Sequence, residues 1–96
     1  MYKITKAKPF VIEGEHGTYE IPVIKELDFN QLTEVVLIQD ESDFKKRWGK
    51  IKKYLLKMAP GLESEDLSDS AYVHIYQAYE NESNRPTAEA GESSAS

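Results

Sequence analysis

The stretch FKKRWGKIKKYLLKM, residues 44–58, carries the clearest periodic pattern in this chain. Its large apolar side chains recur at spacings of four, three, four and three residues, at Phe44, Trp48, Ile51, Leu55 and Met58. That spacing is typical of one face of an α-helix. Tyr54 widens the stripe, and lysines cover the opposite side. We therefore expect a helix that begins at Asp40 or Ser42, ends at Met58 before Ala59-Pro60-Gly61, and packs its stripe, Trp48 included, into the core.

A second helix is predicted immediately upstream. Asp28-Phe29-Asn30-Gln31 has the pattern of a capping box, with Asp28 as the N-cap, so we expect a helix from Phe29 to about Gln39. A helix that is apolar on several sides is buried on several sides or meets a partner. One face carries Phe29, Leu32 and Val36, while Val35, Leu37 and Ile38 point elsewhere. The run 35–38 also fits a short buried strand, although the cap favours helix.

The N-terminal part predicts a β-hairpin. Residues 10–14 and 18–21 are β-prone, and the turn between them holds two glycines that are available for positive φ. Pro22 ends the pairing or places it at an edge. A lone hairpin is not stable and must pack on helices.

The C-terminal part predicts an acidic linker over 63–66 and a last helix capped by Ser68. Its core stripe consists of Tyr72, Ile75, Tyr76 and Tyr79. The apolar pattern stops after Glu82. The predicted class is α+β: a hairpin on a small bundle of about three helices, forming one domain over 10–82. Residues 1–9 are a predicted flexible lead-in, and 83–96 a predicted disordered tail.

Composition narrows the classes of function. The chain has 96 residues and a net charge of −5, and it contains no cysteine, which excludes disulfides and thiolate metal sites. We find no pattern of a signal peptide or a membrane span and expect a soluble protein used inside a cell. A core this small gives only a few kcal/mol of net stability, so oligomerisation or partner binding would be a natural supplement.

The chemistry-bearing residues form no recognisable catalytic set. Seven of the twelve Lys and Arg residues lie between Lys45 and Lys57. They form either a face that contacts phosphates or a solvated face whose charge is neutralised by the acidic 63–69 segment. The core stripe on the other side of the helix favours the solvated face. His16 and His74 are expected at the surface, and the tyrosines in the core rather than in a stacking platform. We predict neither an enzyme nor a cofactor.

Several motifs together resemble a known family. In order they are YEIP at 19–22, KELDFNQL at 25–32, DLSDSAYVHIYQAYEN at 66–81 and GESSAS at 91–96. This order is similar to that of the small tail assembly chaperones of long-tailed bacteriophages and prophages. The resemblance covers Phe10 to Ser96, and its order is more specific than any single motif. The basic middle, 45–57, departs from the acidic helices expected there.

The resemblance implies a virion-assembly role in the host bacterial cytoplasm. Such a chaperone coats the tape measure protein until tail tube subunits replace it, and it is absent from the mature virion. In this family a frameshifted longer form commonly recruits the tail tube protein. We expect no membrane partner and no general nucleic-acid binding. Exposed apolar residues are the predicted partner-binding set: Val35, Leu37, Ile38, Leu56 and Val73. Two alternatives stay open, namely a structural component such as a head–tail connector, and a nucleic-acid-binding regulator using helix 45–57.

Overall fold

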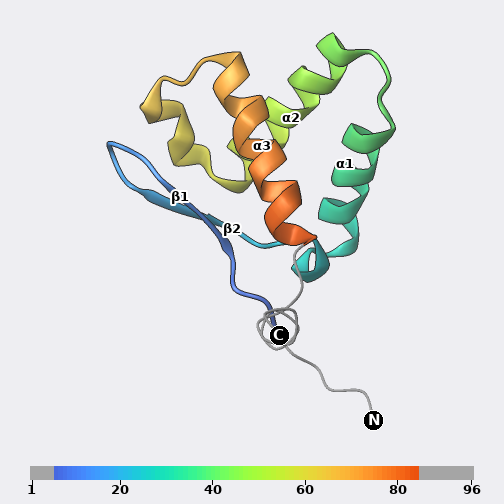
Figure 1. Cartoon of the computed structure of the whole chain (residues 1–96), viewed down its shortest axis with the longest axis horizontal. Coiled ribbons are helices and arrows are strands. Elements are labelled where there is room, and N and C mark those ends of the chain that lie inside the picture. The colour runs from blue at the N-terminus through green and yellow to red at the C-terminus, as the bar shows by residue number, and fades with distance from the viewer. Residues whose placement is uncertain (1–5, 85–96) are drawn as a thin grey trace, which may run out of the picture.

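The chain folds as a β-hairpin followed by three α-helices, as predicted (Figure 1). The computed structural model describes residues 6–84. In chain order the elements are β1 (Phe10–Glu13), β2 (Thr18–Ile21), the 3-10 helix η1 (Ile24–Glu26), α1 (Phe29–Asp40), α2 (Phe44–Met58), the 3-10 helix η2 (Pro60–Glu65) and α3 (Asp69–Ser83). Helix α3 packs along α2, α1 lies on the other side of α2, and the hairpin covers the opposite edge of the bundle.

The hairpin is a two-stranded antiparallel sheet with Phe10 opposite Ile21 and Glu13 opposite Thr18. Alternate residues face the helices, and the Phe10 ring meets the Tyr79 ring edge-on at 5.6 Å between centroids. Pairing stops at Ile21, as Pro22 predicted. The predicted use of positive φ in the turn is wrong, because neither turn glycine has it. A Cβ at Gly14 would lie 2.5 Å from the carboxyl carbon of Glu65, so a larger residue there would displace the Glu65 side chain.

Two of the three α-helices begin at the predicted caps. The Asp28–Gln31 capping box is formed in both directions, and Ser68 caps α3 by accepting the Ala71 N–H. Residues 35–38 are therefore helical, and the strand alternative is wrong. The predicted start of α2 is also wrong. Asp43 is the N-cap, because its carboxylate accepts the N–H groups of Lys45 and Lys46.

The segments outside the bundle depart from prediction at two points. The acidic linker is not irregular, because most of it belongs to η2, in which Leu62 is fully buried. Ser83, assigned to the tail, closes α3 instead, and its hydroxyl accepts the Ile24 N–H at 3.1 Å. The rest of the predicted tail, from residue 85, and residues 1–5 of the predicted lead-in lie outside the described residues.

The core lies between the three helices and the inner face of the hairpin. Three tyrosine rings form its centre, with centroids 5.8–6.1 Å apart: Tyr54, Tyr76 and Tyr79. The Tyr79 hydroxyl donates to the carbonyl of Pro22 at 2.7 Å, so the Tyr54 hydroxyl, 2.8 Å away, donates to Tyr79. Burial raises the pKa of the Tyr54 and Tyr79 phenols, which stay neutral. The tyrosines are core residues rather than a stacking platform.

Candidate functional site

The predicted partner-binding residues do not form one exposed surface. Leu37 is exposed, as predicted. The predicted exposure of the other four is wrong. Val35 and Ile38 are each 1% exposed and Val73 is buried, because their sides of α1 and α3 face the core. Leu56 is half-buried against the core, where the last turns of α2 are covered by neighbouring elements.

Apart from Leu37, the exposure of the apolar residues of α1 is the reverse of the prediction. At roughly 100° per residue, Phe29, Leu32 and Val36 fall within about 60° of one another. This face is the exposed one, while Val35 and Ile38 turn into the core. The Phe29 side chain is 82% exposed, the largest exposure of any large apolar residue in the described chain. We call Phe29, Leu32 and Val36 the outer face of α1.

The outer face of α1 carries one charge at its C-terminal end. Asp40, one turn after Val36, is the only exposed charged residue of the helix, and the other exposed side chains that flank the face, Thr33 and Gln39, are uncharged. Glu34 lies on the side towards α2 and is paired there. Over twelve residues the helix is about 18 Å long. The apolar residues of the outer face, from Phe29 to Val36, therefore offer about two turns of apolar surface to another helix.

A second apolar patch lies at the start of α2. Phe44 and Trp48 pack on each other at 5.7 Å between ring centroids, and they are 66% and 40% exposed. Their predicted place in the core is wrong, although they share the stripe of the buried Ile51 and Leu55. The reason is the length of the neighbouring helix. Glu41, just after the end of α1, pairs with Lys50, so the two earlier turns of α2 extend beyond α1 (Figure 1).

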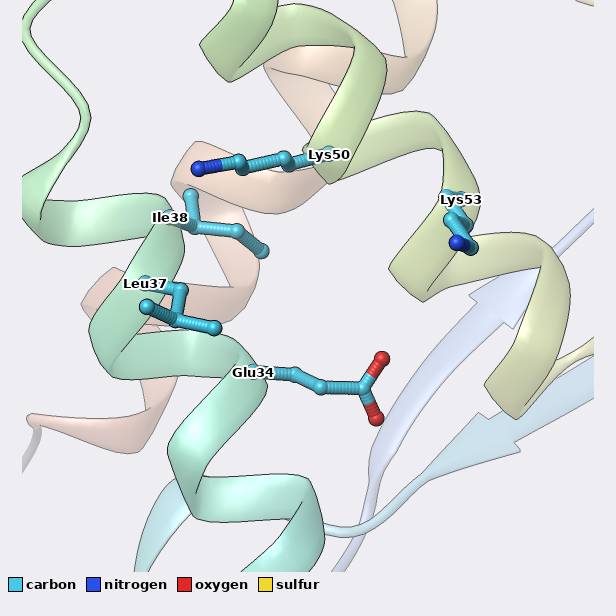
Figure 2. Close-up of a pocket in the computed structure, with 5 residues that line it drawn as sticks. All are labelled: Glu34, Leu37, Ile38, Lys50 and Lys53. Atoms are coloured by element: carbon cyan, nitrogen blue, oxygen red, sulfur yellow. The ribbon is translucent and has the colours of Figure 1, made fainter.

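Between α1 and α2 lies a groove of about 190 Å³. It is lined by Glu34, Leu37 and Ile38 from α1 and by Lys50 and Lys53 from α2 (Figure 2). At one end the Lys57 ammonium donates to Glu34 at 2.7 Å, and at the other the Lys50 ammonium donates to Glu41 at 2.8 Å. The Lys50 ammonium also holds the pKa of the Glu41 carboxyl below its usual range.

The basic face of α2 is partly neutralised by the chain itself. Besides Lys50 and Lys57, Lys52 pairs with Asp69 at 3.4 Å and lies over the Tyr72 ring. Of the three carboxylates that pair with these lysines, only Asp69 comes from the acidic 63–69 segment, which we expected to neutralise them. The other two carboxylates belong to α1 and the residue after it. The remaining lysines of the helix, Lys45, Lys46 and Lys53, have no ion pair among residues 6–84.

One carboxylate, Glu65, fixes the tip of the hairpin, a role that was not predicted from the sequence. It accepts the N–H groups of Glu15 and His16 at 2.8 and 2.9 Å and the Tyr19 hydroxyl at 2.7 Å. The Tyr19 hydrogen bond, followed by those two N–H groups, lowers the pKa of the Glu65 carboxyl. The two turn glycines and the acidic segment 63–66 are visible in the sequence. No local pattern connects them, because Glu65 and its hydrogen-bond partners lie 46–50 residues apart in the chain.

No arrangement for metal binding is found among the described residues. Within 6–84, no group of three or more His, Asp or Glu side chains is placed to hold a metal ion. His16 and His74 are both at the surface, as predicted. No helix in this part of the chain combines the length and the apolar composition that crossing a bilayer requires.

The exposed apolar surfaces of α1 and α2, with the groove between the helices, are therefore the candidate functional site. No protein-family model, curated protein or solved structure matches this chain.

Proposed function

We propose that this protein is a tail assembly chaperone of a long-tailed bacteriophage or prophage. In this role it binds apolar helical segments of a tape measure protein during tail morphogenesis and leaves before the virion is complete. The proposal draws on the order of sequence motifs from YEIP to GESSAS. It draws equally on surface chemistry, since the molecule presents apolar helix faces of its own to solvent.

The observation that carries the proposal is the outer face of α1. Phe29 is 82% exposed and, with Leu32 and Val36, presents apolar area to water. A partner helix would cover this area. An amphipathic helix laid against such a face is a recurrent mode of recognition. One copy covers only a few helical turns, so a long partner requires many copies.

The test is co-expression with a tape measure protein, followed by sedimentation. The long chain should sediment when made alone and stay soluble with this protein. The double substitution Phe29→Glu with Val36→Glu should abolish that protection and leave the fold intact, because both side chains are exposed. Gln77→Glu with Asn81→Glu is the matched control, since it adds the same charge to exposed sites on α3. Equal sedimentation with and without the wild-type protein would refute the proposal.

Salt distinguishes this role from a nucleic-acid-binding one. Apolar burial is not screened, so the complex should survive high salt. Binding to DNA or RNA that weakens steeply with salt would instead identify the basic face of α2 as the functional surface. A structural tail component, unlike a chaperone, would be detected by mass spectrometry of purified virions.

A further inference from the structure

Two ion pairs join α1 and α2, and between them lies a lysine of α2, Lys53, that has no ion pair among residues 6–84. We call the position of Lys53 the middle rung. The helices run antiparallel, because Glu34 meets Lys57 at one end and Glu41 meets Lys50 at the other. On α2 the lysines of this edge recur at positions 50, 53 and 57, which is one side of a helix. Between the two ion pairs α1 places Leu37 and Ile38, which line the groove together with Lys53, and the Glu34 carboxylate in this groove is already paired with Lys57.

The middle of the groove therefore offers one cation beside one apolar surface. Lys53 is exposed and has no ion pair among residues 6–84, whereas both neighbouring lysines on its edge are paired. Leu37 is half-exposed, and Ile38 forms the floor. Figure 2 shows Glu34 extending from α1 and Lys50 from α2 into the space between the helices, on either side of Leu37 and Ile38.

We propose that this groove binds an acidic amphipathic helix. One carboxylate of that helix takes the middle rung at Lys53, and an adjacent apolar side chain packs on Leu37. The inference rests on the proposed function only for the identity of the partner. It selects, among the segments of a tape measure protein, those with aspartate or glutamate flanking an apolar stripe.

Charge complementarity sets this occupant apart from others. A basic helix would be repelled by Lys53, because it is the lysine of this edge that no carboxylate of residues 6–84 neutralises, whereas Lys50 and Lys57 are paired. A second copy of this chain would offer a single such carboxylate, Asp40 beside the outer face of α1, and self-association of the protein alone would identify that copy as the occupant and overturn the proposal. The charge on the outer face of α1 is the Asp40 carboxylate, which does not attract an acidic segment, so the groove is where selectivity for acidic segments arises.

The experiment uses three synthetic helical peptides with the same leucine stripe. Their flanking positions carry glutamate, glutamine or lysine. Titration by calorimetry at low salt should show the glutamate peptide binding about tenfold more tightly than the lysine peptide, with glutamine between them. The difference should shrink at high salt, because the contact with Lys53 is exposed. Equal affinities for the three peptides at low salt would overturn the proposal.

Two substitutions place the effect at the middle rung. Lys53→Gln should weaken the glutamate peptide by about three- to fivefold and leave the glutamine peptide unchanged. Leu37→Glu puts a carboxylate of the chain itself opposite Lys53 and should weaken the glutamate peptide at least as much. Lys45→Gln and Gln77→Glu are the charge-matched controls, and neither should change the affinity. Circular dichroism confirms that each variant is folded. Loss of selectivity in the controls, or its survival in Lys53→Gln, would refute the assignment to this rung.

The two proposals fail separately. If the protein selects the glutamate peptide but does not keep a tape measure protein soluble, the groove stands and the chaperone role falls. If it keeps that protein soluble without preferring any peptide, the chaperone role stands and the groove does not set its specificity.

Discussion

The inner and outer faces of α1 carry the same kinds of side chain and have opposite surroundings. Val35 and Ile38 are sealed in the core, while Val36 and Phe29, on the same helix, are in contact with water. Neither intrinsic hydrophobicity nor helix propensity distinguishes the two sets. What distinguishes them is which side of the helix α2 and α3 cover. Burial in a domain this small is thus a property of position, and equal residues should give unequal mutational effects.

The comparison is tested most directly within α1. Ile38→Ala should lower the free energy of unfolding by about 3 kcal/mol, since it leaves a cavity in a core that has little stability to lose. Val36→Ala, only two residues away but on the outer face, should change it by less than about 0.5 kcal/mol. Urea unfolding followed by circular dichroism measures both. Similar losses for the two variants would mean that the outer face is covered in solution.

A second contrast lies along the stripe of α2. Sequence periodicity alone predicts a core-sized loss of roughly 3–5 kcal/mol for Trp48→Ala. The structure reduces the expectation to about 1 kcal/mol, because the indole extends beyond α1, is 40% exposed and packs on Phe44, which is itself exposed. Leu55→Ala, fully buried on the same stripe, should cost about 2–5 kcal/mol.

Fluorescence gives an independent check, since Trp48 is the only tryptophan. Its emission should be quenched readily by acrylamide in the folded protein. A blue-shifted emission that acrylamide does not quench would show that Trp48 is buried in the core.

The smallest effect concerns two glutamates of η2. The pKa of Glu65 is lowered by hydrogen bonds in the folded state, so its contribution to stability is present above the unfolded pKa of about 4.3 and is lost as the pH falls through the lower folded pKa. Glu65→Gln should remove this part of the acid dependence and speed amide exchange at Glu15 and His16. Glu63→Gln, exposed in the same segment, should do neither. Unchanged exchange in Glu65→Gln would show that the hairpin tip is held by other contacts.

Much of the fold could be predicted because its signals are local. A capping box, a serine cap and a proline act within a few residues, and they located the starts of α1 and α3 and the end of β2. The start of α2 was missed by a small margin, because Asp40, Ser42 and Asp43 are all acceptable caps and only the path of the preceding loop selects one.

The site was harder to predict, for two physical reasons. Helix α1 has six large apolar residues among twelve, spread around most of its circumference, so its periodicity cannot say which side is covered. Helix α2 has one clear stripe, whose direction was predicted correctly for Ile51 and Leu55. Periodicity gives the direction of a stripe but not how far along it the neighbouring helices reach, and Phe44 and Trp48 lie past that limit.

The hydroxyl chain from Tyr54 through Tyr79 to Pro22 has a consequence in alkaline solution. Each phenol must keep its proton to donate, and burial leaves no solvent to stabilise a phenolate at either position. Unfolded tyrosines ionise near pH 10. Above that pH the unfolded chain is stabilised because its tyrosines release protons that the folded chain retains. The free energy of unfolding therefore falls as the pH rises. The interior that joins hairpin to helices thus also sets the upper pH at which the domain stays assembled.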